Sequence, residues 1–325
     1  MAHRMDRREF LTASAAAAAG LTLGAGRTAC AQGPFKHTLH KAVIVRKPTE
    51  ETLKKLKDAG FEGVEAGIVK PDEAKTYREA GDKLGMRIHS VLRGWAKFNS
   101  DKPADVESSL KTTEDALLAA QAYGADDILL VPARIGGKGL AIPQPWEFKI
   151  QFDEKTGHLT SVVAEDNDKY RDYIAAHNHA HDTCQAAIKK LIPVAEKANV
   201  IIWVENVWNN LFVEPHLFAN FVDSFQSSWV RAYFDLGNHV KYSPPEQWIP
   251  VLGKRIVKCH VKDFKLNPDG HGGKFVNIRD GSVNWPVVRK ALDDIGYDGW
   301  MTIEGSGKLP YEEQSKRLDL ILAGK

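Results

Sequence analysis

The chain has few cysteines and almost no excess of charge of either sign. Three cysteines in 325 residues are too few for a scaffold held by disulfides. The 44 basic and 42 acidic residues give a net charge of +2, whereas nucleic-acid-binding domains usually carry a basic surplus. Hydrophobic residues make up 43% of the chain, which argues against disorder and supplies a large core. We therefore expect a globular protein that does not bind nucleic acid.

Long apolar runs are also scarce, and the only stretch that resembles a membrane segment lies near the N-terminus. Residues 1–31 have the pattern of a twin-arginine export signal: an Arg-Arg pair at 7–8, an alanine-rich run and a small-x-small cleavage pattern at 29–31. The run is too short and too weakly hydrophobic for a spanning helix. A lipoprotein anchor at Cys30 is the alternative, but Arg27 stands where a lipobox has an apolar residue.

This leader would account for the small positive charge. Removing residues 1–31 takes away four basic and two acidic residues, which leaves 40 of each in a mature chain of 294 residues. The twin-arginine machinery exports proteins that are already folded, so we expect residues 32–325 to form a periplasmic or secreted enzyme without a stable membrane anchor. Cys184 and Cys259 could pair in that compartment. Because Cys259 lies within an expected strand, we interpret both as buried free thiols.

A glycine fingerprint is missing after the first expected strand, which argues against an open, doubly wound sheet that binds a dinucleotide. From residue 41 onward, strand and helix signals alternate, and they give eight βα units, the number in a TIM barrel. The strands are continuous apolar runs, as expected where both faces are covered. They lie at residues 41–46, 64–66, 86–92, 127–131, 200–204, 230–234, 256–261 and 300–303. Long helices are expected at residues 50–59, 71–84, 104–123 and 173–197.

Two segments of the chain resemble each other. Residues 56–65 and 292–304 each combine a helix end, a glycine, an aromatic residue and a strand that ends in glutamate. In a ring of eight units these segments would lie next to each other on either side of the first strand.

The mature chain exceeds the usual barrel length of about 250 residues by about forty. Residues 132–169 lack a helix signal and read as a β-hairpin, with strands at 146–152 and 158–163. Because this insertion follows the fourth strand, it would emerge at the catalytic face and could form a lid there. A contact within a homo-oligomer or a surface ornament is the alternative.

Four successive expected strands end in a residue that can bind a metal: Glu205, Asp235, His260 and Glu304. The C-terminal ends of barrel strands share one rim, so these side chains would converge. Three neighbouring carboxylates repel one another unless a cation is present. We therefore expect one divalent metal ion. The oxygen-rich set favours Mn²⁺ or Mg²⁺, with Co²⁺ and Zn²⁺ as alternatives.

Several short motifs, in this order and at these strands, resemble the xylose isomerase-like TIM-barrel superfamily, the sugar phosphate isomerase/epimerase group. The resemblance covers roughly residues 41–322. It rests on AGFEGVE at 59–65, VEN at 204–206, FDLGN at 234–238, HVKD at 260–263, DGSVNW at 280–285 and GYDGWMTIE at 296–304. It implies a mononuclear metal site made of the same four residues. It also implies that Glu205 and Glu304 move protons on opposite sides of a bound keto sugar, through a metal-stabilised enediolate.

The sequence departs from the pattern of this group at two places. Many relatives have a substrate-binding histidine three residues after Asp235, where this chain has Asn238 followed by His239. The loop at 279–281 reads Arg-Asp-Gly instead of Gly-Glu-Gly. Both differences leave the identity of the sugar open. Because phosphorylated sugars are chiefly cytoplasmic and export is expected, a free or glycosidically linked sugar is favoured.

Polar and aromatic residues that end or follow the expected strands are candidates for substrate binding, because they can hold hydroxyls or stack on sugar rings. They are Glu65, His89, Trp95, Arg134, Trp208, Asn238, His239 and Lys262. A run of alternating histidines at 177–181 looks like a second metal cluster. Only His177 and His181 share a helix face, and we interpret the segment as a solvated helix start.

Other functions remain open at this point. A lyase or hydratase could use the same metal and the same carboxylate pair on a keto sugar. A sugar-binding barrel without chemistry is disfavoured because all four ligands are present. A DNA-repair nuclease of the same superfamily would need further metal ligands and a basic face, and export argues against it.

Overall fold

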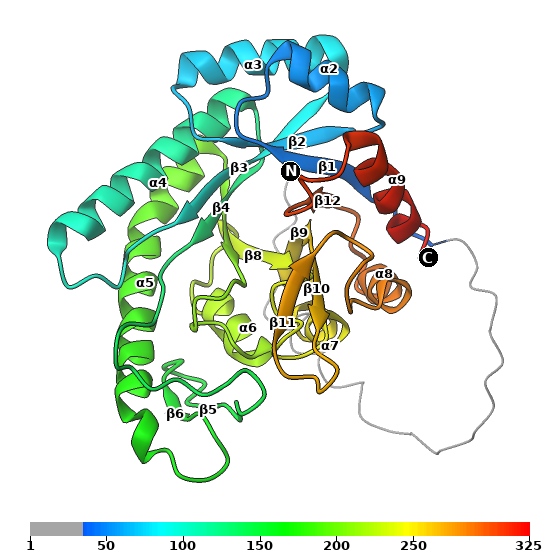
Figure 1. Ribbon diagram of the computed structural model, residues 1–325. Coiled ribbons are helices and arrows are strands. Elements are labelled where there is room, and N and C mark those ends of the chain that lie inside the picture. Colours follow the sequence, from blue (N-terminus) through cyan, green and yellow to red (C-terminus); the bar gives the residue numbers. More distant parts are fainter. Residues whose placement is uncertain (1–34) are drawn as a thin grey trace. The chain divides into compact units, whose positions relative to one another are not determined.

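Eight parallel strands close into a barrel in the part of the chain that the computed structural model describes, residues 35–325 (Figure 1). The order around the ring is β1-β2-β3-β4-β7-β8-β9-β12, and β12 pairs with β1. The predicted TIM barrel is confirmed, and the closed ring excludes a doubly wound sheet. The expected leader at residues 1–31 lies outside the described residues. The barrel strands are β1 (His40–Val45), β2 (Gly63–Gly67), β3 (Arg87–Trp95), β4 (Asp127–Val131), β7 (Ile201–Glu205), β8 (Val230–Asp235), β9 (Ile256–Val261) and β12 (Trp300–Ile303).

Helices between the strands surround the barrel and cover its outer face (Figure 1). This cover explains why the strands are rich in continuous apolar residues, as in β4, where all residues are buried and only Asp127 at its start is polar. Predicted and observed ends of the listed strands and long helices agree to within three residues. The helices are α2 (Glu50–Asp58), α3 (Pro71–Leu84), α4 (Pro103–Tyr123), α5 (Arg171–Ala198), α6 (Pro215–Asp223), α7 (Pro245–Leu252), α8 (Trp285–Asp294) and α9 (Tyr311–Leu322).

The two similar segments are neighbours around the ring, as predicted. Strands β2 and β12 both pair with β1, one on each side. The glycines of the two segments have positive φ angles, 91° at Gly60 and 77° at Gly296. Residues with a side chain rarely adopt this backbone conformation, which explains why glycine follows the helix in both segments.

The insertion at 132–169 contains a hairpin that is shorter than predicted, with β5 (Gln151–Phe152) antiparallel to β6 (Leu159–Ser161). A second antiparallel hairpin, which the sequence did not predict, follows β9 and consists of β10 (Asp263–Leu266) and β11 (Gly273–Val276). The two additions touch, because the ring of Trp146 stacks on His271 between β10 and β11 at a centroid distance of 4.2 Å.

Within residues 35–325, no helix is both long enough and apolar enough to cross a membrane. Cys184 and Cys259 are buried free thiols, as predicted.

The histidines of α5 differ from the expectation of a solvated helix start. His177 and His181 are buried, and only His179 is exposed. His177 Nε2 donates a hydrogen bond to the Leu211 carbonyl oxygen at 2.9 Å. Burial lowers the pKa of His177 to about 4.

This buried histidine predicts a loss of stability in mild acid. Below the ordinary histidine pKa of about 6.5, His177 is protonated in the unfolded chain but stays neutral in the folded protein down to about pH 4. Because the unfolded state then binds more protons, the free energy of unfolding falls as the pH falls. Between pH 7 and pH 5, His177 alone accounts for about 2 kcal/mol. Urea unfolding at both pH values should show a smaller drop for His177→Gln than for the wild type. His179→Gln is the matched control and should behave like the wild type; an equal drop in all three proteins would contradict the interpretation.

Candidate metal centre

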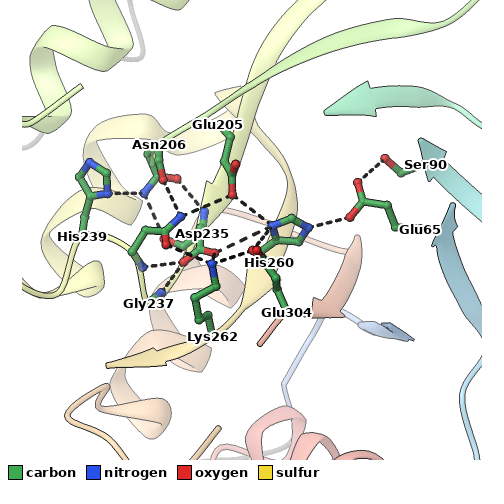
Figure 2. A network of polar contacts seen from close by, with 11 residues as sticks. Glu65, Ser90, Glu205, Asn206, Asp235, Gly237, His239, His260, Lys262 and Glu304 are labelled. Carbon is green, nitrogen blue, oxygen red and sulfur yellow. Dashed lines mark hydrogen bonds and ion pairs between the residues drawn. The ribbon is translucent and has the colours of Figure 1, made fainter. Parts of the chain in front are cut away.

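Four side chains converge at the end of the barrel where the strands have their C-termini, here called the rim (Figure 2). Glu205 and Asp235 are the last residues of β7 and β8, His260 is the last but one of β9, and Glu304 directly follows β12. His260 Nδ1 lies 3.2 Å from Glu205 Oε1, 3.0 Å from Glu304 Oε2 and 3.9 Å from Asp235 Oδ2. One ligand atom of each residue lies within 4.8 Å of the others. The predicted convergence is therefore confirmed.

The orientation of Asp235 suits it to bind a cation. Its Oδ1 atom accepts hydrogen bonds from the backbone N–H groups of Gly237 at 2.8 Å and Asn238 at 2.6 Å. Its Oδ2 atom is buried and accepts no hydrogen bond from any residue in the described range 35–325. The Lys262 Nζ atom lies 3.4 Å from this oxygen, an ion pair without a hydrogen bond. Three carboxylates and an imidazole, with one buried carboxylate oxygen that accepts no hydrogen bond, fit a divalent cation.

His260 is held from its far side by a second carboxylate. Its Nε2 atom lies 2.7 Å from Glu65 Oε2, and both side chains are fully buried. The Ser90 hydroxyl donates to Glu65 Oε1 at 3.0 Å and so fixes that carboxylate. In the neutral imidazole, which is the form that binds a metal, a carboxylate at Nε2 would hold the ring proton there and leave the lone pair of Nδ1 facing Glu205 and Glu304. Glu65, expected to bind substrate, here contacts His260.

Burial and mutual repulsion govern the charges of the centre. Burial, supported by the Glu304 and Asp235 carboxylates, raises the pKa of Glu205 to about 7. Burial also raises the pKa of Asp235. Burial opposes the charged form of His260, but the carboxylates of Glu65 and Glu304 outweigh it and raise the pKa of the imidazole well above its usual value. The centre therefore attracts positive charge, which a dication would supply.

Lys262 brings one positive charge to the centre. Its Nζ atom lies 2.8 Å from Glu304 Oε2 and 3.4 Å from Asp235 Oδ2, and it donates to Asn238 Oδ1 at 3.2 Å. Burial opposes the charge, but these carboxylates raise the pKa of Lys262 above its usual value. Asn238 in turn donates to the Asn206 carbonyl oxygen at 3.1 Å. Asn238 and Lys262, both predicted to bind substrate, thus lie at the centre.

A cavity of about 580 Å³ opens onto the centre at the rim. Glu205, His260 and Glu304 lie in its wall, together with the predicted residues Trp95 and Lys262. No residue of the insertion at 132–169 lines it, so the insertion does not form a lid over this cavity in the described structure.

Three basic residues in the wall of this cavity were missed: Arg46, Lys47 and Arg93. Arg46 directly follows β1, and Arg93 lies near the end of β3. The strand-end rule that identified the metal ligands could have found both, had it been applied to basic side chains as well as to metal-binding ones.

The other predicted substrate residues lie in different surroundings. His89 is the third residue of β3, which continues to Trp95, so His89 does not end the strand as expected. Its ring stacks on Trp300 at 4.5 Å, and its Nε2 atom lies 3.1 Å from Thr302 Oγ1. Arg134 is exposed, with its guanidinium 5.7 Å from the centroid of the Trp95 ring.

Two of these residues use their polar atoms within the protein. His239 is buried; its Nε2 atom donates to the Phe212 carbonyl oxygen at 2.5 Å, and its Nδ1 atom accepts from Asn206 Nδ2 at 3.2 Å. Trp208 donates its indole N–H to the Asn238 carbonyl oxygen, and its ring stacks on Phe275 of β11 at 4.8 Å.

The HVKD and DGSVNW motifs meet through Asp263, which organises a loop of the rim. Its carboxylate accepts hydrogen bonds from the backbone N–H groups of Arg279, Gly281 and Val283 at 3.0, 3.0 and 3.2 Å, and from Trp285 Nε1 at 3.3 Å. A Cβ atom at Gly281 would overlap this carboxylate, so the close approach requires glycine. The two motifs therefore hold the loop between β11 and α8.

Comparisons with known proteins agree with the barrel fold. The chain is 22% identical over 262 residues to inosose dehydratase from Lacticaseibacillus casei, covering 78% of this chain and 81% of the relative. Among solved structures, a D-tagatose 3-epimerase-like protein shares 18% identity at a TM-score of 0.67, over 88% of this chain and 97% of that one. The 3-keto-D-glucoside 4-epimerase of E. coli shares 13% identity at a TM-score of 0.65, over 88% and 100%. The family model described as xylose isomerase-like TIM barrel matches residues 53–320. The chain therefore belongs to the xylose isomerase-like TIM-barrel family.

Proposed function

We propose that this protein is a metal-dependent isomerase or epimerase of a free or glycosidic keto sugar. One observation carries the proposal: Glu205 and Glu304 both line the cavity and both contact His260 Nδ1, although they come from strands that are separated by β8 and β9. A substrate in the cavity would thus meet a carboxylate from each of two directions. Sugar epimerases share the fold.

The reaction requires removal of a proton from the carbon next to a ketone. One glutamate accepts this proton, and the other returns a proton to the opposite face of the same carbon, or to its neighbour in an isomerisation. A divalent cation held by Glu205, Asp235, His260 and Glu304 would stabilise the negative charge that develops on the carbonyl oxygen. Lys262, whose Nζ atom lies 2.8 Å from Glu304 Oε2, can donate a hydrogen bond to a substrate oxygen.

The cavity suits a sugar in size and lining. Its volume of about 580 Å³ lies within the usual range for small-molecule sites. Trp95 offers an aromatic face, and Arg46 and Lys47 offer hydrogen-bond donors at the cavity wall. Arg93 instead donates from Nε and Nη2 to Thr113 and to the Ser109 carbonyl oxygen. Trp95, Arg46 and Lys47 support a polar, hydroxyl-rich ligand.

Dehydration of a keto sugar is the second candidate, because a relative that matches 78% of this chain is named an inosose dehydratase. The first step is the same: a carboxylate removes the proton next to the ketone. The hydroxyl on the next carbon then leaves with a proton as water, so the product is lighter by one water.

Proton transfer can be tested in heavy water. Mature protein supplied with Mn²⁺ and keto sugars should incorporate deuterium at the carbon next to the ketone and form an epimer or isomer of unchanged composition. Glu205→Gln and Glu304→Gln keep an oxygen that can bind metal but lose the base, so exchange should fall by roughly 10² to 10⁴-fold. Removing the metal with a chelator should also abolish exchange, and adding Mn²⁺ should restore it.

Glu312→Gln is the matched control, since Glu312 is exposed at the start of α9. It should exchange at the wild-type rate. A product lighter by one water would favour the dehydratase. Full exchange in Glu304→Gln, with metal bound as in the wild type, would refute the assigned role of Glu304.

The contact between Glu65 and His260 predicts an effect on metal affinity. Glu65→Ala removes the carboxylate that orients the imidazole and should weaken Mn²⁺ binding about 10 to 100-fold. Glu65→Gln keeps an acceptor for Nε2–H and should weaken it less. Calorimetric titration of the metal-free proteins with Mn²⁺ measures the affinity of each variant. Equal affinity in the wild type and in a folded Glu65→Ala variant would exclude the orienting role.

We also propose export by the twin-arginine route, on the basis of residues 1–31. In a bacterial host with this machinery, the full chain should accumulate folded in the periplasm and lose its leader. The double variant Arg7→Lys, Arg8→Lys should remain in the cytoplasm. Periplasmic accumulation of the double variant would contradict the proposal.

A further inference from the structure

We propose that His158, His181 and Asp182 form a second metal site, for a divalent transition ion of the zinc class, that fastens the insertion to α5. His158 lies in the insertion, directly before β6, whereas His181 and Asp182 lie on α5. Figure 1 shows β5 and β6 beside α5. Neither the insertion nor α5 contributes a ligand to the centre at the rim.

The three side chains converge on a single oxygen. Asp182 Oδ1 lies 2.8 Å from His158 Nε2 and 3.3 Å from His181 Nδ1. One ligand atom of each residue lies within 4.8 Å of the other two. Two imidazoles and one carboxylate, with a fourth position left for water, are a set of ligands that Zn²⁺ commonly takes. This set is richer in nitrogen than the centre at the rim, so the two sites should differ in metal preference.

The backbone around the site is held in place by hydrogen bonds. Leu159, next to His158, donates its N–H to Asn178 Oδ1 at 2.7 Å and accepts from Asn178 Nδ2 at 3.2 Å. Asn178 lies one helical turn before His181 and Asp182 on α5. A second bond, from Asn220 Nδ2 to the Glu154 carbonyl oxygen at 2.8 Å, ties the preceding turn to α6. These hydrogen bonds hold the turn before β6 against α5 and α6, as a preorganised site requires.

The side chain of His181 is held in one orientation by its surroundings. Its side chain is 3% exposed, and its Nε2 atom packs against Gly157, where a Cβ atom would overlap the ring. Gly157 has a φ of 73°, so its conformation also favours glycine. Because Nε2 is buried and has no hydrogen-bond partner in the described part of the chain, Nδ1 is the nitrogen that faces Asp182 and His158.

Charge and access also suit a metal ion. Asp182 supplies a negative charge between the two rings. The side chains of His158 and Asp182 are 36% and 59% exposed, which leaves the open position of the site accessible to solvent.

The site would act on the rim through the insertion. A metal here joins the turn before β6 to α5, and the same insertion donates Ile135 N–H to the Asn209 carbonyl oxygen at 2.8 Å and stacks Trp146 on His271. Fastening one end of the insertion would therefore hold the loops that it contacts. The site itself requires no catalysis, and its test does not depend on the function proposed above.

The experiment is a zinc count on the mature chain and on matched variants. Metal-free protein is dialysed against Zn²⁺, and bound zinc per chain is measured by elemental analysis. The wild type should bind two zinc ions, one at each site. His158→Ala and Asp182→Asn should each bind one. His179→Ala, an exposed histidine on the same helix, is the control and should bind two.

A background variant separates this site from the rim. The double variant Asp235→Asn, His260→Asn removes ligands of the first centre and should retain one zinc, which is lost when His158→Ala is added. Zn²⁺ should also slow proteolysis within the turn at 153–158 in the wild type and in His179→Ala, but not in His158→Ala. Equal zinc counts in the wild type, His158→Ala and Asp182→Asn, or zinc protection of the turn in His158→Ala, would overturn the proposal.

Discussion

The buried imidazole of His260, placed between Glu65 on one side and Glu205 and Glu304 on the other, is the contact on which the rim depends (Figure 2). Burial of charged groups is costly unless opposite charges and hydrogen bonds compensate. Here each carboxylate has such a partner: Glu65 has Ser90 and His260, and Glu304 has His260 and Lys262. Asp235 keeps one oxygen without a hydrogen bond in the described structure. The Lys262 ammonium lies 3.4 Å from that oxygen, and a cation held by the four side chains would add to this charge compensation.

The strands of the barrel fix the positions of these side chains relative to one another. Glu205, Asp235 and His260 lie on β7, β8 and β9, which are adjacent in the ring, so their spacing follows from the hydrogen-bonded register of the strands. Asn206 also links β7 to β8 through its side chain. Its Oδ1 atom accepts a hydrogen bond from Asp235 N–H at 2.7 Å, and its Nδ2 atom donates to the Asp235 carbonyl oxygen at 3.1 Å. A rigid strand framework with variable loops lets one barrel fold support different chemistries.

Much of the fold could be predicted from the sequence, because strands covered on both faces are continuous apolar runs and a polar residue at the end of such a run stands out. Glu205 and Asp235 were found in this way. The contact between Glu65 and His260 joins residues 195 positions apart, and it depends on side-chain directions that no local pattern shows. The burial of His181 was missed for a related reason: barrel helices usually expose one face, but here the insertion packs against α5, with Gly157 next to the His181 ring. His177 is covered elsewhere, where its ring meets the Leu211 carbonyl oxygen.

The placement of a metal by Glu205, Asp235, His260 and Glu304 is the central claim, and anomalous diffraction tests it most directly. Crystals of the mature protein soaked in Mn²⁺ should give an anomalous peak within bonding distance of all four side chains, and the peak should vanish in Asp235→Asn, His260→Asn crystals. A fully occupied Mn²⁺ peak elsewhere, with none among these four residues, would contradict the account.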